Sequence, residues 1–89
     1  MRAVLTVVGE DKVGIFAKVS NFCAERNVNI EGVSQTVLED MFCMIMMITV
    51  DGCTVPFGEF SDSIKEYGEQ NGLVIHAMHE DIFNSMHRI

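Results

Sequence analysis

The stretch Asp-Lys-Val-Gly-Ile-Phe-Ala-Lys-Val-Ser, residues 11–20, decides the fold because the periodicity of the chain changes across it. Before it, residues 2–8 are β-branched and apolar at almost every position, which is typical of a strand covered on both faces. After it, apolar residues recur at helical spacing, at Ile15, Val19, Phe22 and Cys23. The sequence therefore predicts a central strand, a loop with glycine at both ends, and a first helix over roughly residues 14–27.

Two adjoining strands are predicted after this helix. Residues 28–38 alternate loosely, as in an edge strand, and one face is predicted to carry Val28, Ile30, Thr36 and Leu38. Glu39-Asp40 makes a tight turn. Residues 41–50 then run apolar almost without interruption and are too rich in strand formers for a surface helix. They predict a second central strand, antiparallel to the edge strand.

A second helix and a fourth strand follow. Thr54 is predicted to cap this helix, and Pro56 suits its first turn, where a missing N–H is tolerated. Asn71-Gly72 supplies the stop, and residues 73–80 form the fourth strand. Between these signals the apolar residues keep helical spacing, at Phe57, Phe60, Ile64 and Tyr67.

The tail is predicted to form a short helix over about residues 81–88. Asp81 at its start and His87 and Arg88 at its end match the helix dipole. Its apolar residues share one side, by which we expect it to dock on the rest of the chain: Ile82, Phe83, Met86 and Ile89.

The order of these elements predicts one domain over residues 1–89, an α+β sandwich of the ferredoxin-like βαββαβ type. Right-handed crossovers give a four-stranded antiparallel sheet of order 4-1-3-2, with two helices on one face. The two strands that are apolar at almost every position, residues 2–8 and 41–50, are the two in the middle of that sheet. Composition and topology therefore agree.

Charge and cysteine content exclude several kinds of partner. The chain of 89 residues carries 13 acidic and 6 basic side chains, a formal net charge of −7 that repels nucleic acid and anionic membranes. Its 3 cysteines are odd in number and show no Cys-x-x-Cys spacing, as expected of reduced thiols. We find no secretory leader pattern and no apolar run of membrane-spanning length, so we expect a cytoplasmic protein.

The residues around the first strand–helix junction resemble a known family. Asp11-Lys12-Val13-Gly14-Ile15 offers an acidic residue, a basic residue, glycine and an aliphatic residue, and Asn29-Ile30 opens the second strand. This pattern resembles the ACT domain family, over essentially the whole chain, and the tail resembles the small stand-alone members. The resemblance implies a regulatory domain that binds a small molecule, usually an amino acid, at the interface between two domains.

The resemblance also implies which residues bind the ligand: Asp11, Lys12, Val13, Gly14, Ile15, Asn29 and Ile30. The first turn of a helix has unpaired N–H groups that suit a carboxylate. Asp11 then receives the ligand's ammonium, Gly14 lets it approach the backbone, and Asn29 donates and accepts hydrogen bonds. Many family members have proline where this chain has Val13, which predicts a less rigid loop. A purely local alternative is that Asp11 caps the helix and Gly14 serves the turn.

Other functions have weaker support in the sequence. A structural protein–protein interaction module without a ligand is the main alternative. A metal site is disfavoured because strand alternation puts Met44 and Met46 on one face and Cys43 and Met47 on the other, and it likewise separates His76 from His79. The small phosphatases and RNA-binding modules that share this element order need an arginine-bearing anion loop or exposed aromatic residues with a basic surface. We expect neither catalysis nor a cofactor.

Assembly is the last expectation from the sequence. The two central strands are apolar on both faces, but the two main helices cover only one side of the sheet. Large apolar patches are unusual on soluble monomers. The sequence therefore predicts a homodimer or higher homo-oligomer that forms by sheet pairing, by packing of open faces, or by both, with the tail helix assisting.

Overall fold

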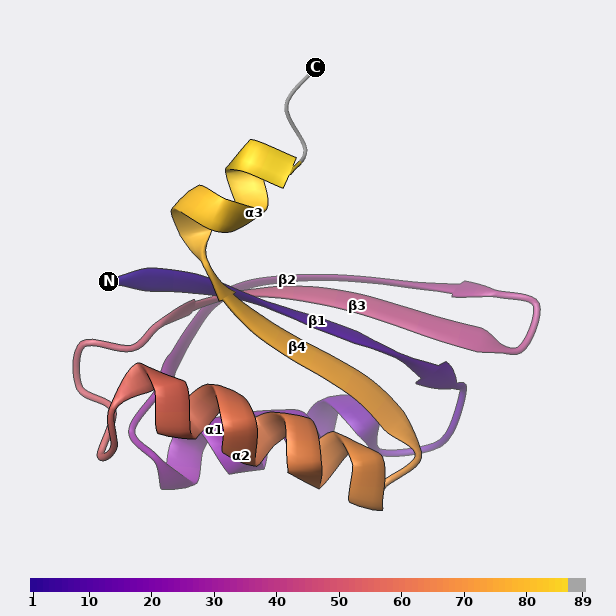
Figure 1. The fold of residues 1–89 in the computed structure, drawn as a ribbon. Coiled ribbons are helices and arrows are strands. Elements are labelled where there is room, and N and C mark those ends of the chain that lie inside the picture. Colours follow the sequence, from indigo (N-terminus) through magenta and orange to yellow (C-terminus); the bar gives the residue numbers. More distant parts are fainter. Residues whose placement is uncertain (87–89) are drawn as a thin grey trace.

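The four strands form one antiparallel sheet in the order β2-β3-β1-β4, which confirms the predicted topology (Figure 1). The computed structural model describes residues 1–86. Seven elements follow one another along the chain: β1 (Arg2–Glu10), α1 (Ile15–Glu25), β2 (Asn29–Leu38), β3 (Met41–Thr49), α2 (Phe57–Gln70), β4 (Leu73–His79) and α3 (Glu80–Met86).

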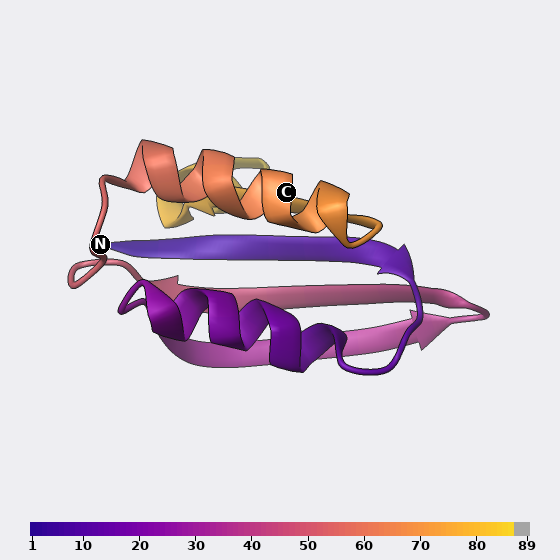
Figure 2. The same ribbon diagram turned by 90° about the horizontal axis from the view of Figure 1, so that it is seen from below.

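The three helices lie on two sides of the sheet. Helices α1 and α2 cover one face, α1 beside β2 and α2 beside β4, and we call this the helix face (Figure 2). Helix α3 lies on the opposite side, where it contacts β1 and β4 (Figure 1). We call this side the open face. Among residues 1–86, no helix is both long enough and apolar enough to cross a membrane.

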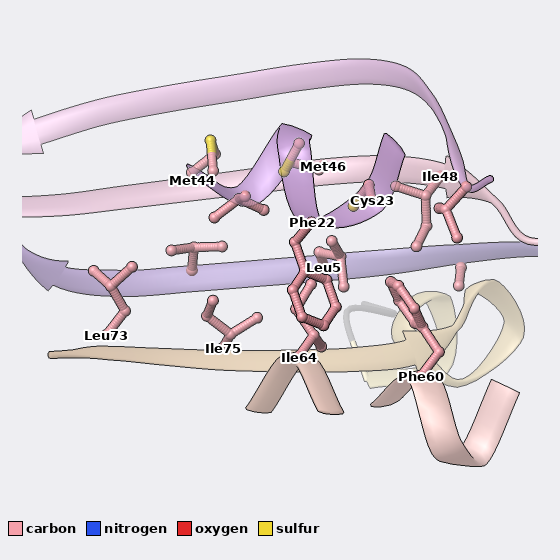
Figure 3. Packing of buried hydrophobic residues seen from close by; sticks show 14 of the residues in the cluster. Leu5, Phe22, Cys23, Met44, Met46, Ile48, Phe60, Ile64, Leu73 and Ile75 are labelled. Atoms are coloured by element: carbon pink, nitrogen blue, oxygen red, sulfur yellow. The ribbon is translucent and has the colours of Figure 1, made fainter. Parts of the chain in front are cut away.

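The core lies between the sheet and the helices α1 and α2 (Figure 3). Alternate residues of β1, β3 and β4 enter it, such as Leu5 of β1 and Met46 of β3, and both are fully buried. Aromatic rings join the two helices, since the Phe22 ring lies 4.9 Å from that of Tyr67 and 6.0 Å from that of Phe60. Met44 and Met46 of β3 fill this core from one face, as the alternation predicted.

Two local predictions are wrong. Thr54 does not cap α2, because the N-cap residue is Pro56 and no side chain accepts a hydrogen bond from the first turn. The Thr54 amide instead donates to the carbonyl oxygen of Arg26 at 3.0 Å. Thr36 and Leu38 do not share a face with Ile30, because a register shift between Ile30 and Gly32 inserts one residue into β2.

The tail begins as predicted and then leaves the described part of the chain. Helix α3 starts at Glu80, one residue before the predicted start at Asp81. His87 and Arg88, which the sequence placed at its end, lie outside the described residues. The predicted turn at Glu39-Asp40 and the predicted stop at Asn71-Gly72 are both confirmed, and Gly72 adopts the positive φ of +72° that favours glycine.

Candidate functional site

The loop between β1 and α1 leaves the start of α1 without a side-chain cap. Gly14 is the N-cap residue, with φ 86° and ψ 9°, and its carbonyl oxygen accepts the first helical hydrogen bond, from the Lys18 amide at 3.0 Å. No side chain accepts a hydrogen bond from the N–H groups of the first turn, so Asp11 does not cap the helix. These N–H groups are the ones that suit a carboxylate ligand.

The space beside this helix start is open. A Cβ on Gly14 would meet no atom within 4 Å, so glycine is required here by its positive φ and not by close packing. Val13 is 100% exposed, whereas Ile15 is buried and anchors the helix in the core. The Lys12 side chain extends toward Gly72, which follows the C-terminal end of α2. Its Nζ lies 3.3 Å from the position that a Cβ on Gly72 would occupy. The loop therefore presents a bare backbone, flanked by the exposed side chains of Asp11 and Val13.

Asn29 and Ile30 lie at the other end of the sheet from this loop. Asn29 pairs with Thr49, and Thr49 pairs with Arg2 at the start of β1, whereas Asp11 follows the end of β1. The length of β1 separates the two ends by roughly 26 Å. The expectation that Asn29 lies beside the start of α1 is therefore wrong within one chain, because α1 runs back along β1 before β2 begins. Ile30 packs against the core.

A second polar cluster, which the sequence analysis missed, surrounds Arg2. Its Nε lies 2.8 Å from Oε2 of Glu80 and 3.9 Å from Oε1 of Glu31, and the ammonium of Met1 pairs with Asp51 nearby. Glu80 Oε2 is shielded from solvent, but among residues 1–86 no donor is aligned for a hydrogen bond to it, so its contact with Arg2 is an ion pair only. The predicted topology already placed the starts of β1 and β2 and the end of β4 at one edge of the sheet. The opposite charges of the residues at these three points were the sequence signal that could have revealed the cluster.

These groups line an open pocket of about 490 Å³. Carboxylates outnumber cationic groups in it, and two of them, Asp51 and Asp81, are well exposed to solvent. His79 accepts a hydrogen bond from the Asp81 amide on its Nδ1 at 3.0 Å. The lining consists of Met1, Arg2, Glu31, Thr49, Asp51, His79, Glu80 and Asp81.

The titratable side chains do not converge on a metal. Among residues 1–86, no three His, Cys, Asp or Glu side chains lie close enough to hold one ion. His76 pairs with Thr6 and His79 pairs with Ala3, so they point to opposite faces, as predicted. Burial raises the pKa of the Cys23 thiol to about 11, against a smaller opposing effect of Arg26, so this thiol stays protonated at neutral pH.

Comparison with known proteins agrees with the fold and with the family resemblance. The sequence model of the ACT domain family matches residues 3–67, most of the chain. The chain belongs to the ACT domain family. ACT domains are ligand-binding regulatory domains, and the resemblance seen at Asp11–Ile15 is thereby confirmed at the level of the family. The matched residues contain α1, β2 and β3 and most of β1 and α2.

Two similar proteins match all or nearly all of this chain. The UPF0237 protein CPE1496 of Clostridium perfringens (strain 13 / Type A) is 48% identical over 89 residues, which cover 100% of both chains. The solved structure of an ACT domain protein from Streptococcus pneumoniae is 36% identical, with a TM-score of 0.82 and 93% of each chain covered. Both of these proteins are therefore about as long as the present sequence.

The same domain also occurs within a larger enzyme. A formyltetrahydrofolate deformylase from Pseudomonas syringae pv. tomato str. DC3000 is 28% identical, with a TM-score of 0.78. The similarity covers 88% of this chain but 27% of the deformylase chain. The ACT domain therefore corresponds to about a quarter of that protein.

Proposed function

We propose that this ACT domain is a non-catalytic regulatory module that binds an amino acid or a related metabolite at an interface between two copies of the chain. The observation that carries the proposal is the start of α1, where no side chain caps the first turn and a Cβ on Gly14 would meet no atom within 4 Å. A ligand carboxylate accepts hydrogen bonds from the N–H groups of this turn, and Asp11 receives the ammonium.

A second copy supplies what one chain lacks. β2 is an edge strand of 10 residues that contains neither proline nor lysine, and its sole charged residue, Glu31, lies at the bulge. Antiparallel pairing of two β2 strands puts the Asn29 end of one copy beside the Leu38 end of the other. Leu38 lies next to the turn whose Asp40 carbonyl oxygen accepts a hydrogen bond from the Asp11 amide at 2.8 Å. In such a dimer Asn29 and Ile30 of one copy approach the Asp11–Ile15 loop of the other.

A regulatory role without catalysis is consistent with the state of the most buried thiol. Burial raises the pKa of Cys23 and holds this thiol in its unreactive protonated form. The three cysteines are free, which fits a cytoplasmic protein, and the net charge of −7 opposes binding to nucleic acid or to an anionic membrane.

A thermal-shift screen of the purified protein against the standard amino acids tests the proposal. A ligand that binds only the folded state stabilises it by about 2.7 kcal/mol at roughly hundredfold excess over Kd, which is a large melting shift for a small domain. We expect one amino acid or related metabolite to give such a shift. If no compound does, the alternative of an interaction module without a ligand takes precedence, and the uncovered open face favours that alternative.

A further inference from the structure

Helix α3 covers one end of the open face but buries little of itself. Val4 of β1 points away from the main core, yet it is 0% exposed, and α3 is the element that lies on its side of the sheet and contacts β1 (Figure 1). No residue of Glu80–Met86 is itself buried, and Ile82 and Met86 are exposed at 55% and 66%. The helix therefore shields the sheet beneath it without being enclosed by the rest of the described chain.

The short length of α3 makes its folding depend on this contact. The helix has 7 residues, about two turns, and isolated helices shorter than roughly 12 residues are marginal in water. The contact with the sheet therefore supplies most of the order of α3. Release from the sheet and unwinding of the helix occur together, so this segment has two states, docked and helical or released and unwound.

One ion pair fixes α3 to the sheet at its first residue. Oε2 of Glu80 lies 2.8 Å from Nε of Arg2, at the start of β1. Arg2 lies on the open face, because its neighbour Ala3 is buried on the helix face. The same nitrogen lies 3.9 Å from Oε1 of Glu31 on β2. Arg2 therefore keeps a second carboxylate within reach when α3 is released.

The ion pair between Arg2 and Glu80 costs little to open. In the docked state Oε2 of Glu80 is shielded from solvent, and among residues 1–86 no aligned hydrogen-bond donor replaces the lost water. The cost of taking a carboxylate out of water offsets much of the attraction within such a pair. Release of α3 returns Glu80 to water and leaves Arg2 beside Glu31, so neither charge is left unpaired and shielded.

We propose that α3 is a strap that opens and closes as a unit over the Val4 end of the open face, and that the ion pair between Arg2 and Glu80 is its catch. In the closed state Val4 is covered. In the open state α3 is unwound, Glu80 is hydrated and Arg2 pairs with Glu31. The main core takes no part in the change, because it lies between the sheet and the helices α1 and α2 on the opposite side. This strap is independent of any ligand at the start of α1.

Labelling of a thiol introduced by Val4→Cys measures the opening, because this position is covered in the closed state. The background Cys43→Ser/Cys53→Ser removes the two partly exposed thiols. Cys23 stays as the reference, since it is 0% exposed in the main core and reacts only when the whole domain unfolds. With an aromatic disulfide reagent we expect the introduced thiol to react at least about tenfold faster than Cys23. Equal rates would show that α3 leaves only on global unfolding, and would overturn the proposal.

Arg2→Gln tests the catch in the same background. It leaves the Glu80 carboxylate shielded and unpaired, so the thiol at position 4 should react about two- to fivefold faster, with the rate of Cys23 unchanged. Adding Glu80→Gln removes the unpaired charge and should slow the reaction again, which a mere loss of Arg2 packing would not do. Glu31→Gln is the matched control and should not speed the reaction. The catch is refuted by no acceleration in Arg2→Gln, by no rescue, or by an equal acceleration in Glu31→Gln.

Hydrogen exchange of the unlabelled wild type measures the same opening without a substitution at Val4. The amides of residues 84–86, in the last turn of α3, should share one degree of protection that is lower than that of β1. In Arg2→Gln their protection should fall further while that of β1 is kept. Protection of residues 84–86 as high as that of β1 would contradict a strap that opens by itself.

Discussion

The Asp11 amide donates a hydrogen bond to the carbonyl oxygen of Asp40 at 2.8 Å, which ties the loop before α1 to the turn between β2 and β3. This bond uses only backbone atoms, so it holds the loop in place whatever side chain residue 11 carries. The Asp11 carboxylate remains exposed and has no role in capping the helix. A mutation of Asp11 therefore changes the chemistry of its side chain without changing the position of the loop.

Asp11→Ala is expected to remove most of the melting shift produced by whichever amino acid the screen identifies, because the ammonium of the ligand loses its partner. The melting temperature of the unliganded protein should stay close to that of the wild type, since the backbone bond to Asp40 is kept. Asp40→Ala is the control, as it removes a neighbouring exposed carboxylate and should leave the shift unchanged. An undiminished shift in Asp11→Ala excludes the assigned site.

Gly14→Ala is expected to destabilise the fold by about 1–2 kcal/mol, because residue 14 holds a φ of +86° that is costly for residues with a Cβ. Gly58→Ala is its counterpart on α2, where a Cβ meets no atom within 4 Å and φ is not positive, and it should stabilise by roughly 0.5–1 kcal/mol. Urea unfolding measures both. Equal effects of the two substitutions would show that the loop relaxes away from the left-handed conformation.

Gly68→Ala should destabilise the protein even though alanine is the better helix former. A Cβ at this buried position on α2 would lie 2.7 Å from Cγ1 of Ile75 and 3.0 Å from the carbonyl oxygen of Leu73. Overpacking of this kind costs about 1–3 kcal/mol, which exceeds the gain of about 1 kcal/mol in helix propensity. The double variant Gly68→Ala/Ile75→Ala, which removes both Cγ1 and Cδ1 of residue 75, should be less destabilised than the sum of the two single variants, and strict additivity would contradict the contact.

The Cys23 thiol predicts a loss of stability at alkaline pH. Burial raises its pKa from 9.0 to about 11 in the folded protein, so the unfolded chain releases the proton first as pH rises. The contribution of the protonated Cys23 thiol to the free energy of unfolding is fully present below pH 9 and is lost between pH 9 and about pH 11. The loss reaches up to about 2.7 kcal/mol, because the pKa differs by about two pH units between the folded and unfolded chains. Urea unfolding of the wild type and of Cys23→Ala across this range measures it, and the slope with pH should be shallower in the variant. Parallel slopes would rule out the raised pKa.

The order of the elements and the composition of the strands could be read from the sequence because both depend on local periodicity. The change from strand to helical spacing across residues 11–20 located β1 and α1, and the apolar run at residues 41–50 located the second central strand. The role of Gly14 in the turn could also be predicted, since few other residues tolerate the conformation that it adopts there.

Two features of the candidate site depended on tertiary structure. Asn29 and Asp11 belong to one sequence pattern, but the return path of α1 along the sheet puts them at opposite ends, so only a second chain can bring them together. The cluster of Arg2, Glu31 and Glu80 joins three strand ends that are far apart in the sequence.

The sequence by itself determined the sheet, its order and the loop that belongs to the ACT pattern, because side-chain spacing is a property of neighbouring residues. The tertiary structure decided which face of the sheet each residue of β2 occupies beyond the bulge. One inserted residue there puts Thr36 on the face opposite to that of Ile30. It also decided that α3 lies on the open face, which leaves Val8 and Val74 uncovered. Burial is settled by contacts between distant segments, and these have no local signature in the chain.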